Sequence, residues 1–256
     1  MELLSDLLTP AQWALALGVT FLAGFVKGVV GFAMPMIMIS GLGSILAPDV
    51  ALAALILPTL MSNGMQALRQ GPRAAAGSVK KFRVFLIVGA VMLILSAQLV
   101  AVMPVSVMLA LIGVPIVAFA IAQIAGWDGR LPAGPTRVFE VGIAAFAGFI
   151  GGFSGVWGPP TVAYLMALDT EKTEQMRVQG VIYGLGAVVL TLAHIGSGVL
   201  NSATVWLSLA LIPPAVLGMW AGGQVQDRID QRFFRRATLW VLLIAGLNLL
   251  RRAFLA

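Results

Sequence analysis

The sequence predicts an all-α polytopic membrane protein with two inverted repeats, and three observations support this prediction. Of the 256 residues, 60% are hydrophobic and only 10% are charged, and the mean hydropathy is +1.00. A glycine-rich motif at Ala23–Pro35 recurs 124 residues later at Ala147–Pro159. Lysines and arginines gather in particular loops. Such a composition places most of the chain in membrane spans rather than in a water-soluble core.

Apolar segments follow one another in the same order in both halves of the chain. A long span precedes an apolar piece that is short for a full crossing, and further long spans follow. In the first half we expect these segments at residues 13–31, 34–47, 50–68, 84–102 and 105–125. In the second half we expect them at residues 138–156, 159–168, 178–195, 205–223 and 237–250. Loops are expected at residues 69–83 and 169–177.

This order predicts a first transmembrane repeat at residues 1–126, a cytoplasmic linker at 127–137 and a second repeat at 138–256. Each repeat would contain one broken or hairpin glycine-rich element plus three transmembrane helices. Outside the motif the two halves align poorly, so the duplication is inferred from the motif and from the order of the segments.

The two motif copies interrupt the first span of each repeat. Each copy has Ala-Gly-Phe, glycines four and seven positions after the first glycine, and a proline eleven positions after it. In lipid, an interrupted helix requires that its freed backbone groups face protein or a water-filled cavity. We expect Pro35 and Pro159 near the first position of a new helix, whose free amides and positive end could bind an anion. The alternative is that the glycines only allow close helix packing.

The positions of lysine and arginine predict the topology. Eight simple spans with a cytoplasmic N-terminus would put nine loop or tail bases inside and six outside. If each broken element instead crosses twice, or dips in and returns, thirteen bases lie inside and only Arg251 and Arg252 lie outside. The positive-inside rule favours the second arrangement. The repeats are then inverted, both termini are extracytoplasmic, and the broken helices meet near the midplane, as in secondary transporters.

Lys27 is the only charged residue well inside a predicted span, and it lies within the first motif. A lysine at membrane depth is costly and indicates a functional site, here the positive partner of an anionic substrate. The alternative is that Lys27 lies close enough to the inner end of its span to reach the headgroups by snorkelling. The second motif has Gly151 at the equivalent position, so the charge would be asymmetric.

Other polar residues at membrane depth are candidates for the same pathway. Asn63 and Gln66 share one helical face, and Gln179 and Tyr183 share another; both pairs could equally serve interhelical hydrogen bonding. The methionines near the first break are expected to pack rather than bind metal. The complete predicted substrate-binding set is Lys27, Gly28, Gly31, Phe32, Met34, Asn63, Gly152, Ser154, Gly155, Trp157, Gly158 and Gln179.

Composition argues against several other classes of protein. The net charge of +6 lies mostly in loops, where it meets anionic headgroups rather than nucleic acid. The absence of cysteine and the single His194 argue against metal sites, redox chemistry and bound cofactors. An enzyme would need a paired acid and base at depth, and the predicted spans hold no such pair. The acidic N-terminus is not that of a signal peptide, so the first span is expected to be retained.

The two motifs resemble those of a known transporter family. Gly24–Gly31 with Pro35, and Gly148–Gly155 with Pro159, are similar to the paired glycine-rich motifs of the TauE/SafE sulfite exporter family, also called the toluene sulfonate uptake permease family. The chain length, the duplicated hydropathy and the basic segment Arg232–Arg236 before the last span also resemble this family.

The resemblance implies a carrier in the bacterial inner membrane for sulfite or organosulfonates. From the inverted arrangement of the two motifs we expect alternating access, with the anion held between them. A channel-like facilitator of small anions is the alternative. The resemblance does not distinguish import from export, proton coupling from uniport, or one oligomeric state from another.

The topology predicts the location of the C-terminus. Two reporters are fused separately after Ala256. The one that requires an extracytoplasmic location should be active, and the one that requires a cytoplasmic location should be inactive. Activity of the cytoplasmic reporter alone would contradict the inverted arrangement.

Overall fold

Helices make up every regular element that the computed structural model assigns in the residues it describes, which are 8–43, 45–97, 104–126, 136–154, 158–196 and 198–255. Five stretches in this part of the chain are long and apolar enough to cross a membrane: Pro10–Val30, Val50–Leu68, Lys172–Gly196, Thr204–Arg228 and Gln231–Phe254. The protein is therefore an all-α polytopic membrane protein.

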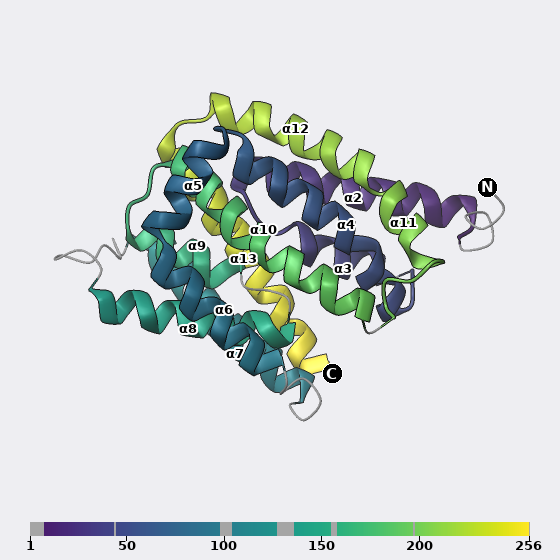
Figure 1. Ribbon diagram of the computed structural model, residues 1–256, viewed down its shortest axis with the longest axis horizontal. Helices are drawn as coiled ribbons and strands as arrows, with labels where there is room; N and C mark the ends of the chain where they lie inside the picture. The colour runs from purple at the N-terminus through teal and green to yellow at the C-terminus, as the bar shows by residue number, and fades with distance from the viewer. Residues whose placement is uncertain are drawn as a thin grey trace. The chain divides into compact units, whose positions relative to one another are not determined.

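Figure 1 labels the helices in chain order. Their bounds are α2 Pro10–Val30, α3 Met34–Leu42, α4 Pro48–Leu68, α5 Pro72–Lys81, α6 Arg83–Ala97, α7 Val105–Ile124, α8 Arg137–Ser154, α9 Gly158–Ala167, α10 Lys172–Gly196, α11 Thr204–Ala210, α12 Ile212–Arg228 and α13 Gln231–Leu255. The expected spans correspond to these helices, and the short pieces after each motif are α3 and α9.

The boundaries differ from the prediction in three places. The expected loop at residues 69–83 contains α5, which begins with Pro72 and continues through three alanines, the best helix formers. The expected loop at residues 169–177 already contains the first turns of α10. The single span expected at residues 205–223 is divided at Leu211, because Pro213 and Pro214 cannot donate backbone hydrogen bonds to the preceding turn.

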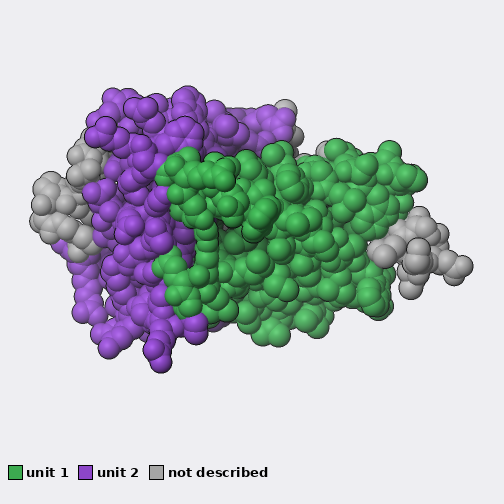
Figure 2. Space-filling model, turned by 90° about the horizontal axis from the view of Figure 1, so that it is seen from above, with its two compact units in different colours: residues 1–71, 180–229 green, residues 72–179, 230–256 purple. Residues whose placement is uncertain are grey.

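The chain divides into two compact units, shown in different colours in Figure 2. Unit 1 comprises residues 1–71 and 180–229, and unit 2 comprises residues 72–179 and 230–256. Each unit thus takes segments from both predicted repeats, so the sequence repeat and the compact unit are different divisions of the chain. The duplication itself stays a prediction.

In unit 1, α2 lies along α12 at a glycine-lined contact (Figure 1). A Cβ added to Gly24 would be 2.2 Å from the carbonyl oxygen of Ala215, and one added to Gly28 would be 2.3 Å from that of Met219. From the other side, a Cβ at Gly222 would be 2.1 Å from the carbonyl oxygen of Phe25. Two backbones this close leave no room for side chains, so Gly24 and Gly28 do serve close helix packing, while the predicted contact of Gly28 with a substrate stays a prediction.

In unit 2, α8 packs against α6 through the equivalent glycine of the second motif. A Cβ added to Gly148 would be 2.2 Å from the carbonyl oxygen of Gly89. Ser96, farther along α6, donates a hydrogen bond to the carbonyl oxygen of Gly148 at 3.5 Å. The helices α6 and α12 have equivalent places in the two halves of the chain. In each half, the broken element is followed by one long helix, α4 or α10, and the next long helix is α6 or α12. The first glycine of each motif therefore makes the same kind of contact within its own unit.

The contacts in unit 1 also give the direction of its helices. Lys27 in α2 bonds Asn63 in α4, and Gly31 just after α2 bonds Gln66, so α2 and α4 run in the same direction. The pairs Gly24 with Ala215 and Gly28 with Gly222 show that α12 is also parallel to α2. Because α2 and α4 are parallel, the chain must return through α3 and the loop after it. This return agrees with the prediction that the broken element crosses the membrane twice, or dips in and returns. Which side of the membrane is cytoplasmic stays a prediction.

Enlarging a glycine at the contact between α2 and α12 should destabilise the protein. We expect Gly24→Leu to cost about 1–3 kcal/mol or more, because the new side chain meets backbone atoms that cannot move aside. The measurement is thermal unfolding of the purified protein in detergent. Gly18→Leu is the matched control in the same helix, since a Cβ there meets nothing within 4 Å. Equal unfolding temperatures for the two variants would contradict the close contact.

Candidate functional site

The first motif breaks the helix as expected from its glycines and proline. Helix α2 ends at Val30, and Gly31 follows in the left-handed conformation with φ of 87°. Its N–H donates to the carbonyl oxygen of Lys27 at 2.7 Å. Ala33 is also left-handed, with φ of 75°, and Pro35 is the second residue of α3. The prediction that Pro35 lies near the first position of a new helix is confirmed.

The second motif includes the end of one described helix and the start of the next at the equivalent place. Helix α8 ends at Ser154, and α9 begins at Gly158, so Pro159 is again the second residue of a new helix. Two predicted site residues of this motif, Gly155 and Trp157, lie outside the described residues. Gly152 and Ser154 belong to α8, and the structure describes the helix there but not their surroundings. The part of the second motif in substrate binding stays a prediction.

Lys27 is buried inside unit 1, with only 1% of its surface exposed. Its Nζ donates a hydrogen bond to Oδ1 of Asn63 and lies 5.9 Å from the centre of the Tyr183 ring. The ring face attracts the ammonium group, and the amide oxygen gives it a strong acceptor. The side chain thus turns toward protein rather than toward a water-exposed end, so the snorkelling interpretation is wrong.

The amide side chains of α4 serve both the lysine and the break. Asn63 and Gln66 are three residues apart on one face of α4 and are 1% and 2% exposed. While Asn63 accepts from Lys27, Nε2 of Gln66 donates to the carbonyl oxygen of Gly31 at 3.0 Å. This carbonyl is one of the groups that the end of α2 leaves without a helical partner. The predicted shared face is confirmed, and both residues form hydrogen bonds between segments, as the second interpretation expected.

The other predicted site residues have different surroundings. Phe32 and Met34 are buried, and Met34 belongs to the apolar core of unit 1 with Met38 and Leu42. That position agrees with the packing interpretation of the methionines. Gln179 is fully buried but belongs to unit 2, whereas Tyr183, one turn later in α10, belongs to unit 1. The structure therefore groups Lys27, Asn63, Gln66, Gly31 and Tyr183.

Two buried threonines extend this polar group, and the sequence analysis did not identify them. Thr59 lies one turn before Asn63 in α4, and Thr20 lies two turns before Lys27 in α2, so each shares the face of its neighbour. Their exposed fractions are 4% and 0%. Neither hydroxyl has a hydrogen-bond partner in the part of the chain that the structure describes. Buried hydroxyls normally have partners, so this face of unit 1 can offer two donors to water or to a bound anion.

An ion pair lies beyond the amide pair at the same end of unit 1. Arg69, three residues after Gln66, donates to Oδ2 of Asp227 at 2.5 Å and to Oε1 of Gln226 at 3.1 Å. These bonds join the ends of α4 and α12. Both charged side chains are about half exposed, so the pair adds little stability, but it sets one boundary of the site.

Comparison with known proteins identifies the family. The family model described as sulfite exporter TauE/SafE matches residues 16–249. The chain belongs to this family. No curated protein and no solved structure matches the chain. TauE/SafE proteins are membrane transporters of the sulfite-exporter type, and the match covers nearly the whole chain. The resemblance inferred from the two motifs is therefore confirmed.

The bond between Lys27 and Asn63 predicts a non-additive pair of substitutions in this TauE/SafE protein. Asn63→Leu should destabilise it by about 2–3 kcal/mol, because a buried ammonium group loses its acceptor. Lys27→Met combined with Asn63→Leu should recover much of that loss, since both polar groups are then gone. The measurement is a double-mutant cycle from thermal unfolding in detergent.

Thr238→Val is the control substitution for this cycle. It removes a buried hydroxyl in unit 2 that has no hydrogen-bond partner among the described residues. Its effect should add independently to that of Asn63→Leu. If the double variant at Lys27 and Asn63 shows only the sum of its two single effects, the two side chains are not coupled.

Proposed function

We propose that this TauE/SafE protein is a secondary transporter that moves sulfite or organosulfonate anions across the bacterial inner membrane. One observation carries the proposal: Lys27 is buried among neutral partners. Its hydrogen-bond acceptor is an amide and its second neighbour is a phenol ring. No ion pair to Lys27 is found among the described residues. A buried cation without a counter-charge is costly at membrane depth, and a substrate anion would neutralise it.

The donors around Lys27 suit an oxyanion. An ammonium group has three N–H donors, and the bond to Asn63 uses one of them. The hydroxyls of Thr20 and Thr59 can donate as well, and both lie on the same helix faces as the ammonium pair. Sulfite and sulfonate groups present several oxygen acceptors on one sulfur atom. Such a group can accept from the remaining N–H donors of the ammonium group, which favours binding in a site that excludes water.

The chain supports a mechanism of alternating access. The residues between α2 and α3 include Gly31 and Ala33, which are both left-handed, so a small change of dihedral angles there would redirect α3. Hinges of moving transporters are a few such positions at the ends of helices. The division into two compact units also suits a motion in which whole units move rather than single side chains. In this proposal the occupied and neutralised Lys27 site faces one side of the membrane at a time.

Ligand stabilisation tests the substrate class. Sulfite, thiosulfate, taurine, an aromatic sulfonate and matched carboxylates are added separately to the purified protein, and the unfolding temperature is measured. At about 100 times its dissociation constant, a specific ligand stabilises by roughly 2.7 kcal/mol. We expect sulfite or one of the sulfonates to give this effect. Stabilisation by carboxylates alone would remove the sulfur assignment.

Lys27→Gln should weaken binding of that anion by about tenfold or more, because a charge-assisted hydrogen bond contributes roughly 1.5–3 kcal/mol. Uptake or efflux of the same anion by proteoliposomes should fall in parallel. Arg73→Gln is the control, since it removes an exposed positive charge from unit 2. Unchanged affinity and transport in Lys27→Gln would exclude the lysine from the mechanism.

A further inference from the structure

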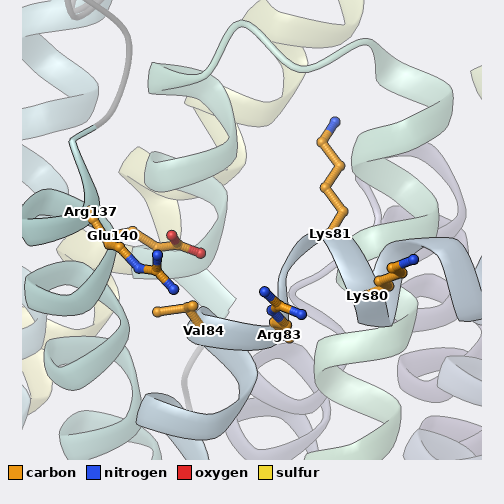
Figure 3. Close-up of a pocket in the computed structure, with 6 residues that line it drawn as sticks. All are labelled: Lys80, Lys81, Arg83, Val84, Arg137 and Glu140. Carbon is orange, nitrogen blue, oxygen red and sulfur yellow. The ribbon is translucent and has the colours of Figure 1, made fainter.

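A basic cavity lies in unit 2, and none of its residues belongs to the Lys27 site (Figure 3). Its volume is about 520 Å³, which is within the usual range of roughly 300–1,000 Å³ for small-molecule sites. The residues around it come from the end of α5, the start of α6 and the start of α8. They are Lys80, Lys81, Arg83, Val84, Arg137 and Glu140.

Four described cations lie around this cavity, and three of them have no counter-ion among the residues that the structure describes. Lys81 donates to Oε1 of Glu174 at 2.7 Å, so its charge is largely compensated. Lys80, Arg83 and Arg137 form no ion pair with any residue that the structure describes. In the view of Figure 3, Arg137 and Glu140 lie on one side of Val84, and Arg83 and Lys80 lie on the other. Glu140 is the only acid among the described residues around the cavity, and these side chains together carry an excess of positive charge.

The start of α8 adds to this positive field. Arg137 is its first residue, and Thr136 caps it by accepting from the N–H of Phe139 at 3.2 Å. The helix N-terminus carries a partial positive charge and favours an anion. Because Arg137 and Glu140 are both in the first turn and both border the cavity, the cavity lies at this terminus. The side-chain charges and the helix end thus act in the same direction.

Exposed apolar side chains accompany these cations. Val138, next to Arg137, is 82% exposed, and Val79, next to Lys80, is 42% exposed. Val84 contributes an apolar surface to the cavity itself. Basic side chains mixed with exposed apolar ones at the ends of membrane helices are typical of contact with anionic headgroups.

We propose that this cavity is a second anion site, which binds a phosphate group through Arg83, Arg137 and Lys80. The phosphate can come from two sources, the headgroup of an anionic phospholipid or a free phosphate ion. Arginine binds phosphate through two parallel hydrogen bonds, and two arginines facing one cavity supply that geometry twice. None of its residues is among those grouped around Lys27.

Thermal unfolding of the full-length protein tests the site and identifies the source. Detergent micelles contain either phosphatidylglycerol or phosphatidylcholine, and a third series contains phosphatidylcholine with inorganic phosphate at constant ionic strength. We expect phosphatidylglycerol or inorganic phosphate to raise the unfolding temperature relative to phosphatidylcholine alone. Stabilisation by phosphatidylglycerol alone assigns a lipid headgroup, and stabilisation by inorganic phosphate assigns a soluble anion.

Variants test the named residues. Each positive charge near the surface is worth about fivefold in binding, so Arg83→Gln with Arg137→Gln should weaken binding about 25-fold. The matched control is Arg73→Gln with Arg232→Gln, which removes the same charge from exposed positions in unit 2 that do not border the cavity. This control should change binding by less than about twofold, because distant surface charges are screened.

Glu140→Gln supplies a test in the opposite direction that does not depend on the double variant folding. Removing this acid from the lining of the cavity should tighten binding about fivefold. The proposal is overturned if neither phosphatidylglycerol nor phosphate stabilises the protein. It is equally overturned if the double variant and its control weaken binding alike, or if Glu140→Gln leaves binding unchanged.

Discussion

The arrangement of unit 1 depends on polar partners for two groups that lie four residues apart at the end of the apolar helix α2. One is the ammonium group of Lys27, and the other is the carbonyl of Gly31 at the helix break, which accepts from a side chain outside α2. Asn63 and Gln66 meet these two needs from a single face of α4. The two contacts occur in the same order along both segments, with Lys27 before Gly31 and Asn63 before Gln66. That order requires α4 to run parallel to α2. The returning α3 is therefore a consequence of how the charge and the break are satisfied.

The glycines of the first motif perform two tasks that the sequence could not separate. Gly24 and Gly28 bring α2 against the backbone of α12, whereas Gly31 supplies the left-handed residue at which α2 ends. The close contact fixes the rotation of α2 about its axis, because only its glycine-lined face can approach α12. With that face held, Lys27 lies one position before Gly28 and turns toward α4. Packing and the proposed anion site are therefore two consequences of one motif.

The sequence predicted the helices, both breaks and the unusual lysine, because apolar length, proline position and a buried charge are local signals. Partner helices were not predictable. Gly218 and Gly222 have the four-residue spacing of a packing surface, but Gly180 and Gly184 have it too, and nothing local says which pair meets α2. Helix α5 was missed because its lysines suggested a loop, although its alanines favour a helix. Thr20 and Thr59 were missed because a threonine in a helix usually bonds its own backbone, and only the structure shows that these two do not.

The two motifs keep the same glycine contact but differ in charge, and the difference has a physical reason if the substrate is a monoanion. One ammonium and one monoanion form a neutral pair, which costs little to hold at membrane depth. A second lysine in the other motif would add a positive charge that one anion could not neutralise. A single lysine also limits the cost of the empty site to one charge, which Asn63 and the Tyr183 ring reduce further. The two motifs therefore share a close glycine contact, while one lysine is enough to neutralise one anion.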